Sequence, residues 1–369
     1  MTYARPRYTR TEVNWAGRTI LDTGADLANL THAYEIVNNW RSSHSYPLLA
    51  FRLGVRVRLR RWAAGSSLVA QRIKRLESIR LKLSLQPSMK LSQMQDIGGC
   101  RAVVTTTRRV LELRDSYIAS RQAHELVHED DYIHNPKASG YRGIHLIYRY
   151  RSATRPEYND LKIELQLRSN LQHAWATAVE TVGTLIEQPL KSSIGRADWL
   201  RFFSLMGSEM AAREGTPTVP GTPTSEKELV TEIRDLAESL RVESVLTGYG
   251  EAIQKIYLGE RQAPYYLLEL RPSAGPTGKG VVTITGYESN QLDEANAKYL
   301  EIERNLKEPG AQAVLVRVES LTALPSAYPN YFLDTRLFLD AVREVIGVPA
   351  SNHTLPPSET NVDGGRNNP

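Results

Sequence analysis

Two carboxylates, Asp96 and Glu164, occupy positions from which they could support metal-dependent chemistry. Asp96 shortly precedes an apolar, β-branched run at residues 100–105, and Glu164 lies on the polar face of a second expected strand at residues 161–167. Carboxylates from two strands of one sheet can hold Mg²⁺ together with a polyphosphate. Phosphoryl transfer then depends mainly on positioning and charge neutralisation. We therefore expect both residues to be metal ligands and catalytic groups.

Basic side chains near these carboxylates could neutralise the phosphates. Taken singly, each is most simply a solvated surface residue. As a set beside two carboxylates they are harder to attribute to chance, and arginine planes can also stack on a nucleobase. The four candidates for the donor side are Arg72, Lys74, Lys82 and Arg101.

The segment 135–145, NPKASGYRGIH, has the composition of a ligand-binding loop. Gly140 permits a tight turn, and Tyr141 is expected at the tip, where an exposed ring can stack on a base. Lys137 and Arg142 flank the ring with charges suited to phosphate. The sequence therefore predicts an acceptor-binding loop.

Charge is distributed unevenly along the 369 residues. Residues 1–200 hold 30 Lys and Arg against 18 Asp and Glu, whereas residues 201–369 hold 16 against 23, which gives the net +5. A basic half indicates an anionic partner. The stretch 56–62, RVRLRRW, is compatible with a solvated face or with an RNA-binding patch, and its candidates are Arg56, Arg58, Arg60 and Arg61.

Composition excludes several classes of protein. The only cysteine, Cys100, rules out an internal disulfide framework and a cysteine-based zinc site, and it fits a reducing cytoplasm. No run is long and apolar enough to cross a bilayer, and the N-terminus lacks an apolar signal core. We expect a cytoplasmic protein with no membrane partner.

The pattern predicts an α+β fold with a mixed sheet flanked by helices. Expected strands cover residues 100–105, 144–150 and 161–167. Expected helices cover residues 10–64 with a break at 40–48, 67–85, 110–119, and a last one capped by Ser169 that runs to about 186.

The second half predicts a separate small α+β module. A Pro-, Gly- and Thr-rich stretch follows residue 213, then a helix over 226–258, strands at 264–270, 281–286 and 313–318, and helices at 293–306 and 331–345. The expected division is a domain at 1–212, a linker at 213–225, a domain at 226–348 and a disordered tail at 349–369.

Four segments resemble the synthetase domain of the RelA/SpoT alarmone synthetases: QRIKRLESIRLKL, QDIGGCRAVV, NPKASGYRGIHLIY and IELQLRSNLQHAWA. The resemblance implies a nucleotidyltransferase-like fold and transfer of the β,γ-pyrophosphate of ATP to a ribose 3′-hydroxyl. It implies that Arg72 and Arg101 sandwich the adenine, that Lys74 and Lys82 bind phosphates, and that Glu164 is the general base beside the Mg²⁺ ligand Asp96. It assigns the acceptor side to Lys137, Tyr141, Arg142, His145, Gln166, Arg168 and His173.

The words VNWAGRTI and NWRSSHSYPL, together with the second half, resemble the toxic small alarmone synthetases of the fused CapRel type. This resemblance implies the 3′ CCA end of tRNA as acceptor, a pseudo-zinc-finger domain without zinc, and activation by a phage major capsid protein. It also implies that Tyr328 and Tyr331, a YxxY pair, plug the adenine site. Two alternatives remain: a (p)ppGpp or ppApp synthetase, and a catalytically inactive RNA-binding sensor.

Overall fold

The structure is a computed structural model of the chain. It describes residues 3–61, 67–121, 123–186, 188, 190–250, 253–259, 263–271, 280–306, 308, 311–318, 321–332 and 335–347. The predicted disordered tail at 349–369 lies outside the described residues.

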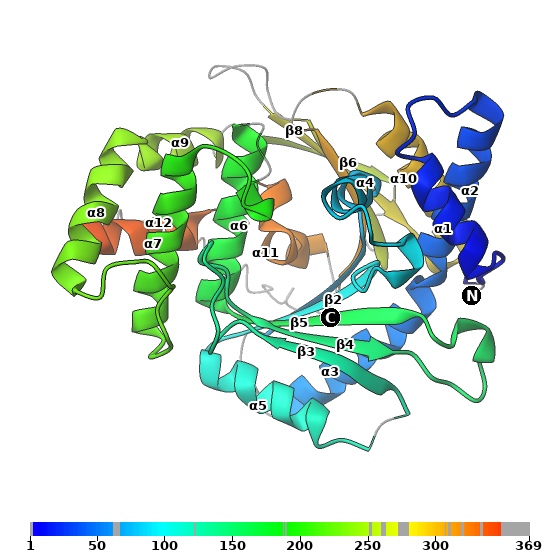
Figure 1. Cartoon of the computed structure of the whole chain (residues 1–369), viewed down its shortest axis with the longest axis horizontal. Coiled ribbons are helices and arrows are strands. Elements are labelled where there is room, and N and C mark those ends of the chain that lie inside the picture. Colours follow the sequence, from blue (N-terminus) through cyan, green and yellow to red (C-terminus); the bar gives the residue numbers. More distant parts are fainter. Residues whose placement is uncertain are drawn as a thin grey trace, which may run out of the picture.

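Within the described residues, one nine-stranded sheet runs through the molecule in the order β3-β4-β5-β2-β1-β9-β7-β8-β6 (Figure 1). The strands are β1 (Leu68–Ile73), β2 (Gly98–Val104), β3 (Glu125–Asp131), β4 (Ile144–Arg149), β5 (Lys162–Ser169), β6 (Ile253–Gly259), β7 (Tyr265–Arg271), β8 (Gly280–Tyr287) and β9 (Gln312–Arg317). The two halves of the chain meet where β1 pairs antiparallel with β9, with Arg72 opposite Val316. Pairing of β2 with β5 is parallel, so the sheet is mixed as expected.

Helices cover both faces of the N-terminal strands. The first-half helices are α1 (Arg10–Thr19), α2 (Leu27–Ser43), α3 (Ser45–Arg61), α4 (Leu76–Leu85), α5 (Thr107–Ile118), α6 (Asn170–Leu185) and α7 (Ala197–Arg213). In Figure 1, α3 and α5 lie below strands β2 to β5, whereas α4, α6 and α11 lie above them. A Cβ on Gly98 would touch Ile163 and Leu48 of α3. Because strand residues alternate, neighbouring Glu164 faces the opposite side, toward α6.

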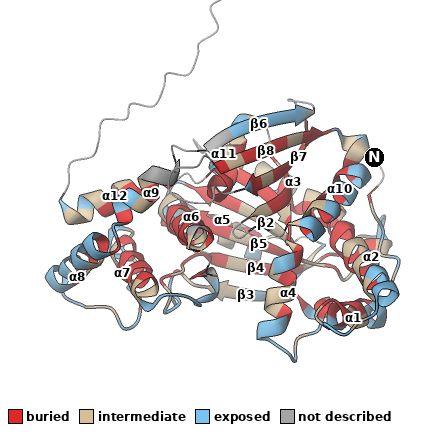
Figure 2. Cartoon of the chain, turned by 90° about the horizontal axis from the view of Figure 1, so that it is seen from above, coloured by how far each residue is buried: buried red, intermediate tan, exposed pale blue. Residues whose placement is uncertain are grey.

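The second half contributes α8 (Glu226–Ser239), α9 (Val242–Gly250), α10 (Leu292–Asn305), α11 (Leu324–Ala327) and α12 (Arg336–Ile346). One hydrophobic core contains Ile36 of α2, Leu165 of β5, Tyr299 of α10 and Leu315 of β9. The buried strands of both halves form a continuous band in Figure 2. Residues before 213 and after 226 thus share one core, and their division into two domains stays a prediction.

Several sequence expectations need correction. Residues 68–73 were expected within a helix, but they form β1, because pairing with β2 and β9 outweighs local helical spacing. Residues 253–259 likewise form β6 instead of continuing a helix. The predicted break at 40–48 shrinks to His44, between α2 and α3. The acidic strand β3 and its pairing with β4 were not predicted.

Candidate functional site

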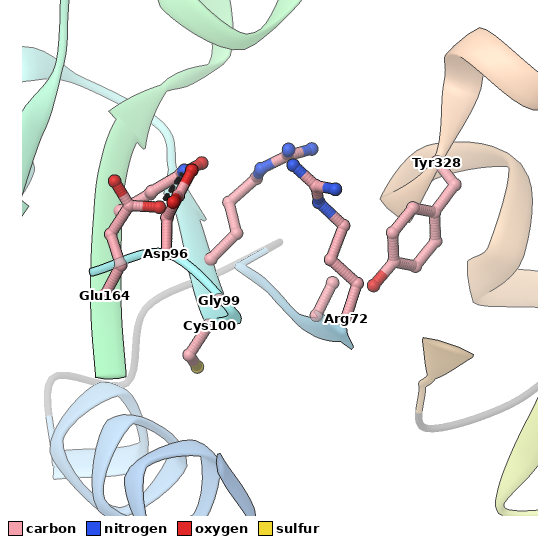
Figure 3. Close-up of a pocket in the computed structure, with 9 residues that line it drawn as sticks. Arg72, Asp96, Gly99, Cys100, Glu164 and Tyr328 are labelled. Carbon is pink, nitrogen blue, oxygen red and sulfur yellow. Dashed lines mark hydrogen bonds between the residues drawn. The ribbon is translucent and has the colours of Figure 1, made fainter. Parts of the chain in front are cut away.

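A small cavity lies where β1, β2 and β5 face the segment that follows α11 (Figure 3). Its free volume is about 10 Å³, room for about one water molecule. Two of the four predicted donor-side residues, Arg72 and Arg101, line it with both carboxylates and one residue of the second half. Lys74 and Lys82 do not line it and contact Asp96 instead. The lining residues are Ala70, Arg72, Asp96, Gly99, Cys100, Arg101, Glu164, Gln166 and Tyr328.

Asp96 is held between Lys74 and Lys82. Lys74 Nζ lies 2.8 Å from Oδ2 and Lys82 Nζ lies 3.0 Å from Oδ1. Burial alone raises the pKa of Asp96, but the two ammonium groups outweigh burial and hold the pKa well below its usual range. Burial lowers the pKa of Lys74 despite its carboxylate partner. Asp96 is therefore an anion that fixes two cations.

Glu164 is the second buried carboxylate. His145 Nδ1 lies 2.9 Å from Oε1, and Gln166 donates from Nε2 to Oε2 at 2.6 Å. Burial alone raises the pKa of Glu164, but the charge and hydrogen bond of His145 lower it. Glu164 is thus ionised, as a metal ligand or general base must be.

His145 connects Glu164 to the acceptor loop. Its Nε2 hydrogen-bonds Tyr141 Oη, which also accepts from Arg168 Nη2 at 2.9 Å. Burial alone lowers the pKa of His145, but Tyr141 and Glu164 raise it to about 9. Burial alone raises the pKa of Tyr141, but Arg168 and His145 bring it down to about 7. Four predicted residues therefore form one hydrogen-bonded chain from Glu164 to Arg168.

The acceptor loop differs from the exposed tip that we expected. Tyr141 is half-buried, and its ring makes an edge contact with Trp175 of α6. Lys137 Nζ lies 4.2 Å from the ring centroid of Tyr132 and 5.6 Å from that of Tyr141. Gly140 has φ +94°, and a Cβ there would lie 2.6 Å from the carbonyl oxygen of Phe203. The loop is therefore seated against α7, and Gly140 is required at the contact.

Arg72 lies beside Tyr328 in Figure 3, and Arg101, the other member of the predicted arginine pair, lines the same cavity. Tyr328 is buried, and its hydroxyl donates to the backbone oxygen of Gln71 at 2.7 Å. Burial, together with Arg168 and Arg72, lowers the pKa of Arg101 to about 10. Among the described residues, the buried Nε of Arg101 has no hydrogen-bond partner. This crowding of positive charge favours an anionic or aromatic ligand.

Other predicted residues lie elsewhere. Arg142 is 2% exposed, and its Nη1 lies 2.6 Å from Glu214 Oε2, so it is committed to a structural ion pair rather than open to an acceptor. Tyr331 does not line the cavity; its hydroxyl donates to the backbone oxygen of Ala313 at 3.3 Å. His173 bonds the backbone oxygen of Ser326 at 3.3 Å, and burial followed by Arg101 and Arg168 keeps its pKa well below its usual value.

The predicted RNA-binding arginines lie on α3, across the sheet from Glu164. Arg60 and Arg61 are exposed. Arg58 packs on the ring of Tyr117 at 3.9 Å and bonds Ser120, and Arg56 is half-buried. The structure does not bring these arginines to the cavity, and their contact with RNA stays a prediction.

A second cavity, of about 470 Å³, opens between α6 and residues 323–329 and 335–338. His173, Asn170 and Thr177 supply polar groups from α6, and Phe338 and Leu68 are among its apolar lining residues. Ser326 and Pro329 lie on either side of Tyr328 in sequence and line the same cavity. Movement of that segment would therefore change both cavities together.

The donor set fits Mg²⁺, although the carboxylates are at present engaged by cations. Asp96 and Glu164 line one cavity and offer the hard oxygen ligands that Mg²⁺ prefers. Both Asp96 oxygens contact lysines that could turn to phosphate oxygens instead. Across the described residues, no group of three or more His, Cys, Asp or Glu could hold a metal by itself. None of the described helices is long and apolar enough to cross a membrane.

Sequence reasoning missed Glu214, the hub behind the acceptor loop. It binds Arg142, Ser169 at the N-cap of α6, and Gln172, whose Nε2 donates at 3.1 Å. Its position in a Pro-, Gly- and Thr-rich stretch predicted a linker. The one feature of the sequence that could have indicated this role is the negative charge of Glu214, which is opposite to that of Arg142 in the acceptor loop.

Comparison with known proteins finds a family match within the first half of the chain. Residues 71–182 match the family described as "Region found in RelA / SpoT proteins". This segment contains Arg72, Asp96, Tyr141 and Glu164, so the RelA/SpoT resemblance predicted from four motifs is confirmed for this part of the chain.

Among individual proteins, GTP pyrophosphokinase YjbM of Bacillus subtilis (strain 168) is 31% identical over 111 residues, which are 30% of this chain and 52% of that protein. The chain thus spans about half the length of this curated relative. Small alarmone synthetase 1 from Bacillus subtilis, solved with its product pppGpp, is 23% identical over 47% of this chain and 90% of that chain, with a TM-score of 0.38. The smu.1046c protein of Streptococcus mutans UA159 is 25% identical over 57% of this chain and 99% of that chain, with a TM-score of 0.38.

Proposed function

We propose that this protein transfers the β,γ-pyrophosphate of ATP to a ribose 3′-hydroxyl, and that the 3′ CCA end of tRNA is its preferred acceptor. The observation that carries the proposal is one cavity lined by two ionised carboxylates and by Arg72 and Arg101, with Lys74 and Lys82 bound to one of those carboxylates, Asp96. In this assignment Lys74 and Lys82 turn from Asp96 to the phosphates, and Arg72 and Arg101 flank the adenine. Mg²⁺ held by Asp96 and Glu164 would neutralise the developing phosphate charge.

Glu164 has the protonation state that a general base requires. Its carboxylate is ionised, and His145 and Gln166 fix both oxygens. The attacking hydroxyl must come within hydrogen-bond reach of this carboxylate. His145 connects the acceptor loop to the proposed general base, because it contacts both Tyr141 and Glu164.

The second half is proposed to keep the enzyme inactive. Tyr328 lines the cavity that the adenine would need, and only about 10 Å³ remains free there. An aromatic ring beside two guanidinium groups can replace a base in a stack. We propose that a phage capsid protein binds the second half and withdraws Tyr328, which makes the chain a self-inhibited defence toxin.

Labelled ATP tests acceptor and inhibition together. The full-length protein and Tyr328→Ala are incubated with γ-labelled ATP and either tRNA or GDP and GTP. Point variants are preferable to truncation at residue 226, because the two halves share a core. Tyr331→Ala is the matched control, since Tyr331 is buried in the same segment but does not line the cavity.

We expect label on tRNA with Tyr328→Ala and little with the unmodified chain. Label on guanine nucleotides from the unmodified protein would refute both the tRNA assignment and the inhibition, and would favour the activity named for YjbM. Absence of transfer in every sample would favour an inactive RNA-binding sensor. Equal activation by Tyr331→Ala would assign the inhibition to the whole segment and not to the occupied cavity.

A further inference from the structure

The short turn 74–76 joins β1 to α4 and sets the position of both lysines on Asp96. Lys74 belongs to the turn itself, and Lys82 lies on the helix that begins at Leu76. Arg75 is the N-cap of this helix, and its side chain makes no capping hydrogen bond. The first N–H groups of a helix have no partners within the helix. The start of α4 therefore needs a partner from elsewhere in the chain.

Glu303 of α10 supplies that partner from the other half of the protein. The backbone N–H of Leu76 donates to Glu303 Oε1 at 2.7 Å. Glu303 Oε2 lies 2.8 Å from Nη1 of Arg41, and the two side chains are only 4% and 1% exposed. A carboxylate at the start of a helix is also favoured by the helix dipole. Glu303 thus caps α4 across a distance of more than two hundred residues in sequence.

Arg41 completes the contact on the strand side of the turn. Its Nε donates to the backbone oxygen of Lys74 at 3.0 Å. The ring of Tyr299, one turn before Glu303 on α10, lies 4.9 Å from the guanidinium carbon. The charge pair therefore holds both ends of the turn, through the carbonyl of Lys74 and the amide of Leu76.

The middle residue of the turn is bound by the second half as well. Arg75 donates to the side chain of Gln312 on β9 and lies 3.3 Å from Glu180 Oε1 of α6. Gln312 in turn donates to Thr184 of α6. Each of the three residues in the turn is thus held by a specific polar contact, and two of the groups responsible come from residues after 300.

We propose that Glu303 is a positioning residue for the polyphosphate of the donor. It fixes turn 74–76, so Lys74 and Lys82 are presented together toward one phosphate chain. The second half therefore completes the donor site as well as covering it with Tyr328. This inference rests on the proposed function, because it takes the lysine pair as the phosphate-binding group.

Binding of magnesium tripolyphosphate to the full-length protein tests the inference directly. This probe has no base, so it does not need the stacking position that Tyr328 occupies. Isothermal titration gives its Kd, and hydrogen–deuterium exchange of the Leu76 amide reports the cap independently. The double variant Arg41→Met with Glu303→Leu removes the buried charges together, a change that proteins often tolerate, but it deletes the cap. Glu301→Gln is the matched control, because Glu301 lies exposed on the same helix and forms an ion pair with nearby Lys298.

In the double variant we expect the hydrogen–deuterium exchange rate of the Leu76 amide to rise about ten-fold. The Kd of magnesium tripolyphosphate should also rise about ten-fold. The melting temperature should stay near that of the unmodified protein. The single variant Glu303→Gln keeps an amide oxygen for Leu76 and should show a smaller change in Kd. Glu301→Gln should change neither quantity.

Unchanged affinity in a folded double variant whose Leu76 amide exchanges faster would overturn the positioning role and leave Glu303 as a stabilising residue only. Failure of the unmodified protein to bind the probe would overturn the donor-site assignment and this inference with it. Should both quantities change as expected while no acceptor is ever labelled, the transfer activity fails and the placement of the lysines by Glu303 stands.

Discussion

Gly140 provides the sharpest test of how the acceptor loop is seated. A methyl group at this position would lie 2.6 Å from the carbonyl oxygen of Phe203 and 2.9 Å from Cζ2 of Trp175. The first is a backbone atom inside α7, so it cannot rotate away. The φ of +94° adds a second cost for any residue with a Cβ. Gly140→Ala should therefore be destabilised for two separate reasons.

The two costs can be separated with a matched glycine. Gly221 has φ +82°, but a Cβ there would meet nothing within 4 Å. Gly221→Ala should lower the free energy of unfolding only by the cost of a positive φ in alanine, about 1–2 kcal/mol. Gly140→Ala should lower the free energy of unfolding by the same amount and by a further ~1–3 kcal/mol from overpacking against α7. The free energy of unfolding, measured by urea denaturation, gives both values.

Gly207 offers the reciprocal substitution across the same contact. Its Cβ would lie 2.6 Å from Cα of Gly140, but Gly207 is helical and carries no conformational strain. Gly207→Ala should therefore cost less than Gly140→Ala, because alanine also favours a helix. Equal losses for Gly140→Ala and Gly221→Ala would refute the close seating of the loop on α7.

Three further outcomes follow from the buried polar groups. Histidine NMR should find the pKa of His145 near 9, and Glu164→Gln should lower this pKa. Because the pKa in the folded protein lies above 6.5, protonated His145 stabilises the fold fully below pH 6.5. This contribution to stability is lost as the pH rises through about 9. A normal His145 pKa would contradict its bond to Glu164. Glu214→Ala should lower the free energy of unfolding by about 3–5 kcal/mol, because it leaves Arg142 buried without its partner. Adding Arg142→Met should restore part of this loss, which a double-mutant cycle measures. Additive effects of the two substitutions would contradict an interaction between Arg142 and Glu214. Burial raises the pKa of Cys100 to about 12, so iodoacetamide at pH 8 should label it only as the protein unfolds, and rapid labelling of native protein would disprove its burial.

Sequence reasoning predicted strand β5 well, because alternation there is strict. Lys162, Glu164 and Gln166 alternate with buried Ile163 and Leu165, so β5 and its polar face could be predicted from spacing alone. Asp96 and its lysines followed from motif order. The family resemblance then joined residues that spacing could not bring together.

Prediction failed where tertiary contacts decide the outcome. Leu68 to Ile73 has no strict alternation, and only the partners β2 and β9 make it a strand. Arg142 has the charge of a ligand-binding residue, yet its direction depends on Glu214, which lies 72 residues away. Glu303 is one acidic residue among several on α10, and nothing local distinguishes it from exposed Glu301.

The pairing of β1 with β9 also sets a schedule for synthesis. The strand that carries Arg72 keeps one edge unpaired until the ribosome has added Val316 and Arg317. At translation rates of about 5–20 residues per second, that interval is on the order of 10–50 s. Tyr328, the proposed inhibitory residue, and Glu303, the proposed positioning residue, are both synthesised in the same final stretch of the chain. Under the proposed function, a nascent chain interrupted before this stretch would lack both the inhibiting Tyr328 and the positioning Glu303, so incomplete synthesis would leave an unassembled donor site and not an uninhibited enzyme.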